Sequence, residues 1–395
     1  MQVKLLYVYT AITVTMQSII RTDMNLFFRE IGFTNADVGN IMSASLWGAA
    51  FLGLGVSIFA DILGRKRMLI ASLIVFPLAN LAMILTNNLS LILLFSFIKG
   101  GFMVVGHTVV QAMVIDITKP KNRAQVVGLN FGIMMGVGVL GNFLGGVLGS
   151  WLGLQNALFF AVFGYFFGLI PLLGIQDKFI GGSFRSIFDI SHFNKEQKII
   201  IVFHFLTTVT IGFGAGLFIH FGNLIFKDLF NMSTFGIGVA LAIAQMGTAI
   251  SNMFTHRMGV YFGPLRFKLI TQTLVVPLIF SMAFIRNPIL FIIVYAMRFV
   301  LMNSGNPIIN TIINSYVPKD KISTIAGLNS LLNNSVRAVA AMLFGYIVGA
   351  SIEGYTTLFI ISGVFYGINI FIAYFMYKRY ENDPKIKELY NHSRG

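Results

Sequence analysis

The sequence reads DILGRKR at residues 61–67, and apolar runs stand on either side of it, at 36–61 and 67–86. Each run is close to the length of about 20 mostly apolar residues that a helix needs to cross a bilayer. Basic residues between two such runs are typical of a short loop on the cytoplasmic side of a membrane. The stretch therefore predicts two membrane-spanning helices joined by a tight, positively charged turn.

The same pattern continues along the whole chain. The sequence is 56% hydrophobic and 11% charged, whereas a soluble domain carries about 25% charged residues. This composition excludes a disordered chain, a coiled coil and an ordinary soluble enzyme. We expect an all-α membrane protein with twelve transmembrane helices, at 4–28, 36–61, 67–86, 89–116, 123–149, 153–175, 198–222, 233–257, 267–285, 288–316, 322–350 and 355–377.

The longest interval between two runs lies between the sixth and the seventh and suggests two halves of six helices. Its apolar and basic residues alternate, as in an amphipathic segment on a membrane surface. We expect an N-terminal half at 1–175, a cytoplasmic amphipathic linker at 176–197, a C-terminal half at 198–378 and a solvated cytoplasmic tail at 379–395.

The basic residues are distributed unevenly around the predicted spans. The chain has 28 Lys and Arg against 14 Asp and Glu, a formal charge of +14. With the N-terminus inside, 21 basic residues, Lys268 among them, fall to inner segments, 3 to outer segments and 4 within spans. Because positive residues favour the cytoplasmic side, we expect both termini in the cytoplasm. The charge is then a topology signal, and no nucleic-acid partner is needed to explain it.

The two halves repeat each other at an offset of 199 residues. Gly64 pairs with Gly263 and Lys99 with Arg298, and the string GLN at 128–130 recurs at 327–329. Polar residues at matched places inside apolar spans are difficult to obtain by chance. A duplicated six-helix unit is typical of secondary transporters, whose site lies between the repeats.

Two loop segments resemble signatures of the major facilitator superfamily. They are DILGRKR at 61–67 and the connection DITKPKNR at 116–123, which leads to Gly128. The sequence departs from the pattern at Asn142, where exporters of the family often carry Pro, and at Val260, the repeat position of Asp61. The resemblance implies the family's fold and an inner gate held by loop charges, for which we assign Asp61, Gly64, Arg65, Lys66, Arg67, Asp116 and Arg123.

Four basic residues fall within the predicted spans. A charge at mid-bilayer costs about 2.5–3.5 kcal/mol on insertion scales, so such residues normally face an aqueous cavity. Polar residues also recur at intervals of four on the same spans, although helix–helix hydrogen bonds would explain them as well. Arg21 could instead extend to the interface or pair with Asp23. The candidate substrate-binding residues are Arg21, Lys99, His107, Gln111, Arg298, Asn306, Asn310, Asn333 and Arg337.

Acidic residues are nearly absent from the spans. Only Asp23 lies within a span away from both of its ends, since Asp37 stands at the outer end of the second span. A cavity with several cations and scarcely any acid attracts anions, so we expect an anionic or amphiphilic substrate. Candidate proton carriers are Asp23, His107 and His220, because His titrates near physiological pH, although a lone His is more often structural.

These features lead to one main hypothesis. We expect a monomeric secondary active transporter in the cell membrane that moves a small solute by alternating access, with proton coupling left open. A multidrug or lipid exporter of the same fold and a non-transporting membrane sensor are the alternatives. The sequence has no cysteine and no phosphate-binding loop, and its acids and histidines form no interfacial cluster. We therefore expect no cofactor, no metal and no enzyme activity.

Overall fold

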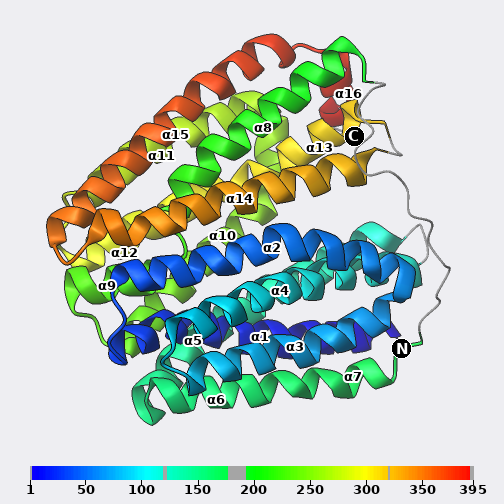
Figure 1. The fold of residues 1–395 in the computed structure, drawn as a ribbon. Coiled ribbons are helices and arrows are strands. Elements are labelled where there is room, and N and C mark those ends of the chain that lie inside the picture. The colour runs from blue at the N-terminus through cyan, green and yellow to red at the C-terminus, as the bar shows by residue number, and fades with distance from the viewer. Residues whose placement is uncertain (1, 119–121, 177–192, 319–320, 392–395) are drawn as a thin grey trace. The chain divides into compact units, whose positions relative to one another are not determined.

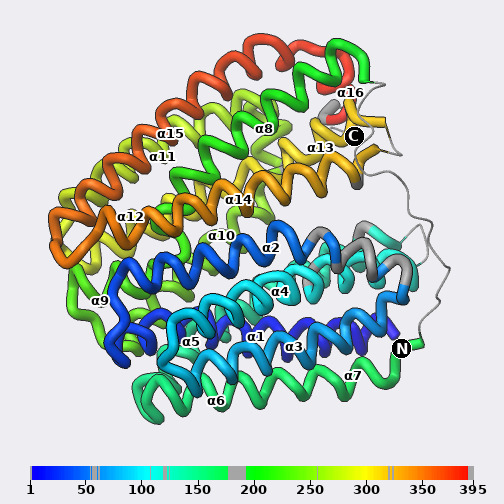
Figure 2. Tube along the Cα trace, viewed as in Figure 1, coloured from blue at the N-terminus to red at the C-terminus, as the bar shows by residue number. Residues whose placement is uncertain are grey.

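The computed structural model describes residues 2–118, 122–176, 193–318 and 321–391 (Figures 1 and 2). Within these ranges every regular element is a helix. The elements are α1 (Gln2–Glu30), α2 (Asn35–Leu63), α3 (Arg65–Leu85), α4 (Leu89–Ile117), α5 (Arg123–Leu152), α6 (Leu154–Tyr165), the 3-10 turn η2 (Phe166–Gly168), α7 (Leu169–Leu173), α8 (Lys195–Gly216), α9 (Gly222–Phe230), α10 (Thr234–Phe262), α11 (Pro264–Met282), α12 (Pro288–Ser304), α13 (Asn306–Tyr316), α14 (Ile322–Val348), α15 (Ile352–Tyr380) and α16 (Pro384–Asn391).

The helices confirm the all-α membrane fold. In the described part of the chain, eleven helical segments are long and apolar enough to cross a membrane, and α2 forms the remaining predicted span with 29 residues. One span, Leu154–Leu173, comprises α6, η2 and α7, and another, Pro288–Tyr316, comprises α12 and α13 on either side of Gly305. Helices of this kind satisfy their backbone hydrogen bonds internally, as a bilayer requires.

Equivalent turns of the two repeats have the same conformation. Gly64, between α2 and α3, has φ +100°, and Gly263, between α10 and α11, has φ +87°. Such angles suit glycine, which has no Cβ to clash. Asn88 and Asn287, also 199 residues apart, both cap the next helix by accepting a backbone N–H, from Leu91 at 3.3 Å and Leu290 at 3.0 Å. The repeat therefore extends to the chemistry of the turns.

The chain divides into two compact units. Unit 1 contains residues 1–185, 220–243 and 341–349, and unit 2 contains 186–219, 244–340 and 350–395. Within unit 1, α1 packs on α5, α6 and α9, and α4 packs on α2 and α3. Within unit 2, α15 packs on α8 and α11, and α13 lies against both α8 and α11. The helices α10 and α14 each contribute residues to both units.

Unit 1 contains close helix crossings at the end where α1 finishes and α2 begins. A Cβ placed on Gly146 of α5 would lie 2.8 Å from the Cα of Gly238 of α10. The Ser150 hydroxyl accepts the backbone N–H of Phe235 at 2.9 Å, and the Asn35 amide donates to the Gly349 carbonyl at 2.9 Å. Small residues let helix backbones approach this closely.

Two chain segments differ from the predictions. The seventh span was predicted to reach residue 222, but α8 ends at Gly216 and a separate short helix, α9, follows. Beyond Arg379, where we predicted a solvated tail, most described side chains are exposed, but α16 forms there and Ile386 is only 1% exposed. Ile386 joins an apolar cluster with Tyr380 and Tyr316. Of the predicted linker, residues 177–192 lie outside the described residues.

The α5–α10 crossing predicts a large effect for a single methyl group. In Gly238→Ala the new Cβ would meet the Gly146 Cα at 2.6 Å and the Asn142 carbonyl oxygen at 2.8 Å, both backbone atoms. Overpacking of this kind costs about 1–3 kcal/mol, so thermal unfolding of the purified protein should occur several degrees lower. Gly136→Ala on α5, where no atom lies within 4 Å of the added Cβ, is the control. Equal stability of the two variants would contradict the crossing.

Candidate functional site

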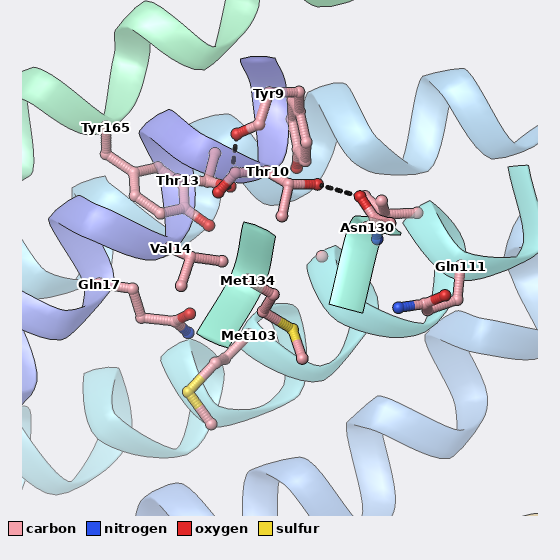
Figure 3. A pocket seen from close by; sticks show the side chains of 12 residues that line it. Tyr9, Thr10, Thr13, Val14, Gln17, Met103, Gln111, Asn130, Met134 and Tyr165 are labelled. Atoms are coloured by element: carbon pink, nitrogen blue, oxygen red, sulfur yellow. Dashed lines mark hydrogen bonds between the residues drawn. The ribbon is translucent and has the colours of Figure 1, made fainter. Parts of the chain in front are cut away.

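Unit 1 holds a small polar cavity between α1, α4, α5 and α6 (Figure 3). The Thr10 hydroxyl donates to the Asn130 side-chain oxygen at 3.1 Å, and the buried Tyr9 hydroxyl has no hydrogen-bond partner among the described residues. None of the lining residues is charged. The cavity can therefore bind water or neutral polar groups of a ligand. It is lined by Tyr9, Thr10, Thr13, Val14, Gln17, Met103, Gly106, Val110, Gln111, Asn130, Met134 and Tyr165.

Only one of the substrate-binding candidates of unit 1 lines this cavity. Gln111 projects toward it from α4 (Figure 3). Lys99 is half-buried on the same helix but is not among the lining residues, and the side chain of His107 lies outside the described residues. Three other lining residues, Tyr9, Thr13 and Gln17, form a row of polar residues at intervals of four that is visible in the sequence of α1. The apolar lining residues cannot be distinguished in the sequence from other apolar residues of the spans.

Asn142 binds α5 to α1. Its buried side-chain oxygen accepts from the Arg21 guanidinium at 3.2 Å and from the Thr22 hydroxyl at 3.3 Å. Arg21 itself is exposed. The position at which exporters often carry Pro thus holds a hydrogen-bond acceptor, which gives Arg21 a partner other than Asp23.

Asp23 is a buried carboxyl group of unit 1. It is 0% exposed, and neither carboxyl oxygen has a hydrogen-bond partner among the described residues. It lies against Gly149 of α5, where an added Cβ would be 3.2 Å from Oδ1. Buried carboxylates are costly unless they are paired or protonated, so a proton is the simplest compensation that this site can take up.

His220 lies near the same part of α1. The Asn25 amide donates to the His220 carbonyl at 2.9 Å and to the Asn223 side-chain oxygen at 3.2 Å. Asn223 in turn donates to the Thr22 carbonyl at 2.7 Å. These bonds hold the backbone of residues 220–223 against α1, so two of the three candidate proton carriers, Asp23 and His220, belong to one region of unit 1.

In unit 2, Arg298 of α12 is enclosed by aromatic rings. It is 1% exposed, and its Cζ lies 4.8 Å from the ring centroids of Phe218 and Phe299 and 5.4 Å from that of Tyr366. It donates a hydrogen bond to the Tyr366 hydroxyl, and its Nε has no partner among the described residues. Cation–π contacts stabilise such a group by about 2 kcal/mol or more when it is desolvated, and no carboxylate of the described residues pairs with it.

The other candidates of unit 2 lie on α13 and α14. Arg337 is partly buried, and its Nε also lacks a partner among the described residues. Asn333, one turn before it, lies beside Gly212 of α8. Asn306 and Asn310 are exposed on α13, whose opposite face of Ile308, Ile309, Ile312 and Ile313 is buried. An exposed amide row within a membrane span fits a water-filled cavity better than lipid.

The candidate gating residues form contacts between the ends of helices in unit 1. Arg65 pairs with Asp116 at the end of α4, and Lys66 donates to the carbonyl of Ile175 at 2.6 Å. Arg123 donates to the Thr118 carbonyl at 3.3 Å. Arg67 is exposed, and the side chain of Asp61 lies outside the described residues. The described partner of the basic cluster is therefore Asp116.

Unit 2 has a different acid at its equivalent turn. Val260 stands where the repeat would place an acid, but Glu381 accepts the backbone N–H of Leu265 at 3.0 Å. A carboxylate is favourable at the start of a helix, here α11, because of the helix dipole. Burial raises the pKa of the Glu381 carboxyl, against the opposing effect of the Leu265 and Arg266 backbone groups.

Lys268 was counted from the sequence among the basic residues of the inner side, and the structure adds that its side chain is buried. Lys268 lies within α11 and is only 4% exposed. Gln272, one turn later, is 2% exposed. A signal existed, because the repeat positions 199 residues earlier are Leu69 and Leu73, and a polar pair in place of two leucines is unusual inside a span.

Comparison with known proteins identifies relatives. The family profile described as Major Facilitator Superfamily matches residues 6–341. The chain is 25% identical over 381 residues to a multi-drug resistance efflux pump PmrA homolog of Lactococcus lactis subsp. lactis, covering 91% of this chain and 87% of that protein. It is 29% identical over 113 residues to the 4-hydroxybenzoate transporter PcaK of Pseudomonas putida, which is 27% of this chain and 25% of that protein.

A solved structure supports the fold. The chain superposes on a bacterial homolog of the human lysosomal transporter Spinster, in an inward-facing and unoccupied conformation, with a TM-score of 0.76 and 13% identity. The superposition covers 95% of this chain and 96% of that chain. At this identity the likeness concerns the fold alone.

The bonds of Asn142 predict a measurable contribution to stability. Asn142→Ala removes the shared acceptor of Arg21 and Thr22, and a lost hydrogen bond costs about 0.5–1.5 kcal/mol. Thermal unfolding of the purified protein should therefore occur at a lower temperature. Asn156→Ala, at an exposed position of α6 where the amide bonds only to its own helix, is the matched control. A variant at 142 no less stable than this control would show that the acceptor is dispensable.

Proposed function

Because the chain belongs to the Major Facilitator Superfamily, whose members are secondary transporters, we propose that it moves a small organic anion across the cell membrane by alternating access. Arg298 is the residue proposed to meet the negative group of the substrate, with Arg337 as the second cation. The observation that carries this proposal is the burial of Arg298 without a carboxylate partner among the described residues.

The charge of unit 2 favours an anion over a cation. Arg298 and Arg337 each retain an Nε without a partner among the described residues, and the described acids of unit 2 stand at helix ends or beyond them, as do Glu196, Glu353 and Glu381. A guanidinium binds carboxylate through paired N–H donors, a stronger contact than a neutral hydrogen bond. An anionic ligand would therefore supply what the protein itself does not provide.

A similarity to a named relative supports the same substrate class. The matching protein PcaK is named as a transporter of 4-hydroxybenzoate, an aromatic carboxylate. Such a molecule has one charged end, a flat ring and a neutral hydroxyl. These groups suit a buried guanidinium, the aromatic rings around it and neutral amides such as Asn306 and Asn310.

Proton coupling is a further part of the proposal. Asp23 is the buried acid of unit 1 and lacks a hydrogen-bond partner among the described residues. We assign it the coupling proton, because a neutral carboxylic acid fits that site better than a carboxylate. We also place both termini in the cytoplasm, the Arg65–Asp116 contact at the inner gate, and the working protein as a monomer.

Multidrug export is the second candidate function. It is favoured by the similarity to the efflux pump PmrA homolog over most of the chain and by a buried acid that could also meet a cation. The two functions differ in the charge of the solute that moves, so a single assay with solutes of opposite charge separates them.

Transport by reconstituted protein tests the anion proposal. Uptake of labelled 4-hydroxybenzoate into vesicles should be saturable, and Arg298→Met should reduce it at least about tenfold, the effect of losing about 1.4 kcal/mol of binding. Arg298→Lys should also lose much of it, because Lys lacks the planar guanidinium. Arg257→Met, at an exposed position of α10, should transport normally. Movement of tetraphenylphosphonium without any organic anion would favour the exporter instead.

Asp23→Asn tests the coupling proton. An amide cannot gain or lose a proton, so accumulation driven by a pH gradient should be lost while exchange of internal for external substrate continues. Both are measured in the same vesicles. Glu30→Gln, at an exposed acid on α1, should leave both activities intact. Gradient-driven accumulation that survives Asp23→Asn would assign the proton to another residue.

A further inference from the structure

Lys268 and Gln272 form a buried polar pair on α11 in unit 2. They are 4% and 2% exposed, and residues four apart lie on the same face of a helix. Neither the side-chain oxygen nor the nitrogen of Gln272 has a hydrogen-bond partner in the described part of the chain. No carboxylate of the described residues pairs with Lys268. The pair therefore combines a charge and an amide that these residues leave unsatisfied.

The lysine extends toward Gly305, where α12 gives way to α13. A Cβ placed on Gly305 would lie 3.1 Å from the Lys268 Nζ. Gly305 stands in the interior of the span Pro288–Tyr316. A lysine that merely relieved its charge would extend toward the nearer end of its helix, so this position inside the unit needs another explanation.

Two apolar clusters enclose the polar pair. Leu265, which stands within one turn before Lys268 on α11, belongs to a cluster with Ile200 on α8 and Ile308 on α13. Beyond Gln272, Val275 and Ile279 pack with Met302 and Tyr366. The pair thus occupies a polar layer between two parts of the hydrophobic core.

His204 of α8 adds a third polar group to this layer. Its Nδ1 is buried and has no partner in the described ranges. The imidazole lies within Coulombic range of the Lys268 ammonium. The helix that begins after Gly305, α13, lies against both α8, which carries His204, and α11, which carries Lys268 and Gln272.

The repeat shows that the fold does not require these polar groups. The positions of Lys268 and Gln272 correspond to Leu69 and Leu73, which are both 0% exposed in unit 1. The position of Gly305 corresponds to Gly106, which lines the cavity of unit 1. Apolar side chains can therefore fill this part of the repeat, and a buried charge is less stabilising than a well-packed apolar side chain.

We propose that this polar layer is a second anion site, which holds a carboxylate between the Lys268 ammonium and the Gln272 amide. The ammonium has three donors and the amide nitrogen has two, which matches the acceptor oxygens of a carboxylate, and His204 offers one further group. Gly305 lets the lysine side chain reach this layer, because a Cβ at Gly305 would overlap the Lys268 Cδ. The site is separate from Arg298, which stands seven residues before Gly305, about 10 Å along the helix axis, with Met302 between them.

Equilibrium binding of labelled 4-hydroxybenzoate to the purified full-length protein tests the proposal without requiring transport. The wild-type protein should bind two anions. Lys268→Met should lose one of these binding events, and Arg298→Met should lose the other. Without ligand, Lys268→Met should unfold at the same or a higher temperature, since an unpaired buried charge is gone. Lys227→Met, an exposed lysine of α9, is the control. Neutral methyl 4-hydroxybenzoate should show no dependence on Lys268.

Gln272→Leu keeps the charge and protects the test if Lys268→Met does not fold. It should weaken the Lys268-dependent binding about tenfold, as expected for about 1.4 kcal/mol. The proposal would be overturned if Gln272→Leu bound the anions like the wild type while Lys268→Met either did the same or failed to fold. So would a Lys268-dependent site that takes chloride and no carboxylate. If the protein showed Lys268-dependent binding but transported no organic anion, the second anion site would be supported and only the proposed transport function would be rejected.

Discussion

Unpaired charge buried among membrane-spanning helices is the constraint on which this structure depends. In a bilayer each such charge must be paired, neutralised or hydrated. In unit 2 aromatic rings surround Arg298, and Lys268 has no carboxylate partner in the described part of the chain. At the repeat position of Lys268 unit 1 has the buried Leu69, so the fold does not require a charge there. The ligand that we propose would bring the negative charge that the described residues do not supply.

Unit 1 meets the same constraint differently. Its cavity contains hydroxyl and amide groups but no charged side chain among its lining residues, and its buried acid, Asp23, lies where α1 meets the close crossing of α5 and α10. Both carboxyl oxygens of Asp23 are buried without a hydrogen-bond partner among the described residues. The Asp23 carboxyl thus stands beside this crossing, which supports the coupling role that we propose for it.

Much of the fold could be predicted from the sequence, because length and hydropathy decide where a helix can cross a bilayer, whereas α9 was missed because it follows an apolar run without a break in composition. The site was predicted less completely, because a sequence shows which residues are polar but not whether they have partners. Arg21 and Arg298 both lie inside predicted spans, yet Arg21 is exposed and bonded to Asn142 whereas Arg298 is enclosed. Lys268 was counted with the inner basic residues because it follows the turn closely, and the burial of its side chain distinguishes it from the exposed Arg266.

The difference between the repeats argues for the kind of molecule that is carried. Gly106 and Gly305 are equivalent, but Gly106 faces hydroxyl groups, with the Tyr165 oxygen 3.8 Å from the position of a Cβ, and Gly305 faces an ammonium. A symmetric solute would be served equally by symmetric halves. Neutral donors and acceptors line the cavity of unit 1, whereas Arg298 and Lys268 are the buried cations described in unit 2. The charge difference between the repeats therefore supports the anion sites that we propose in unit 2.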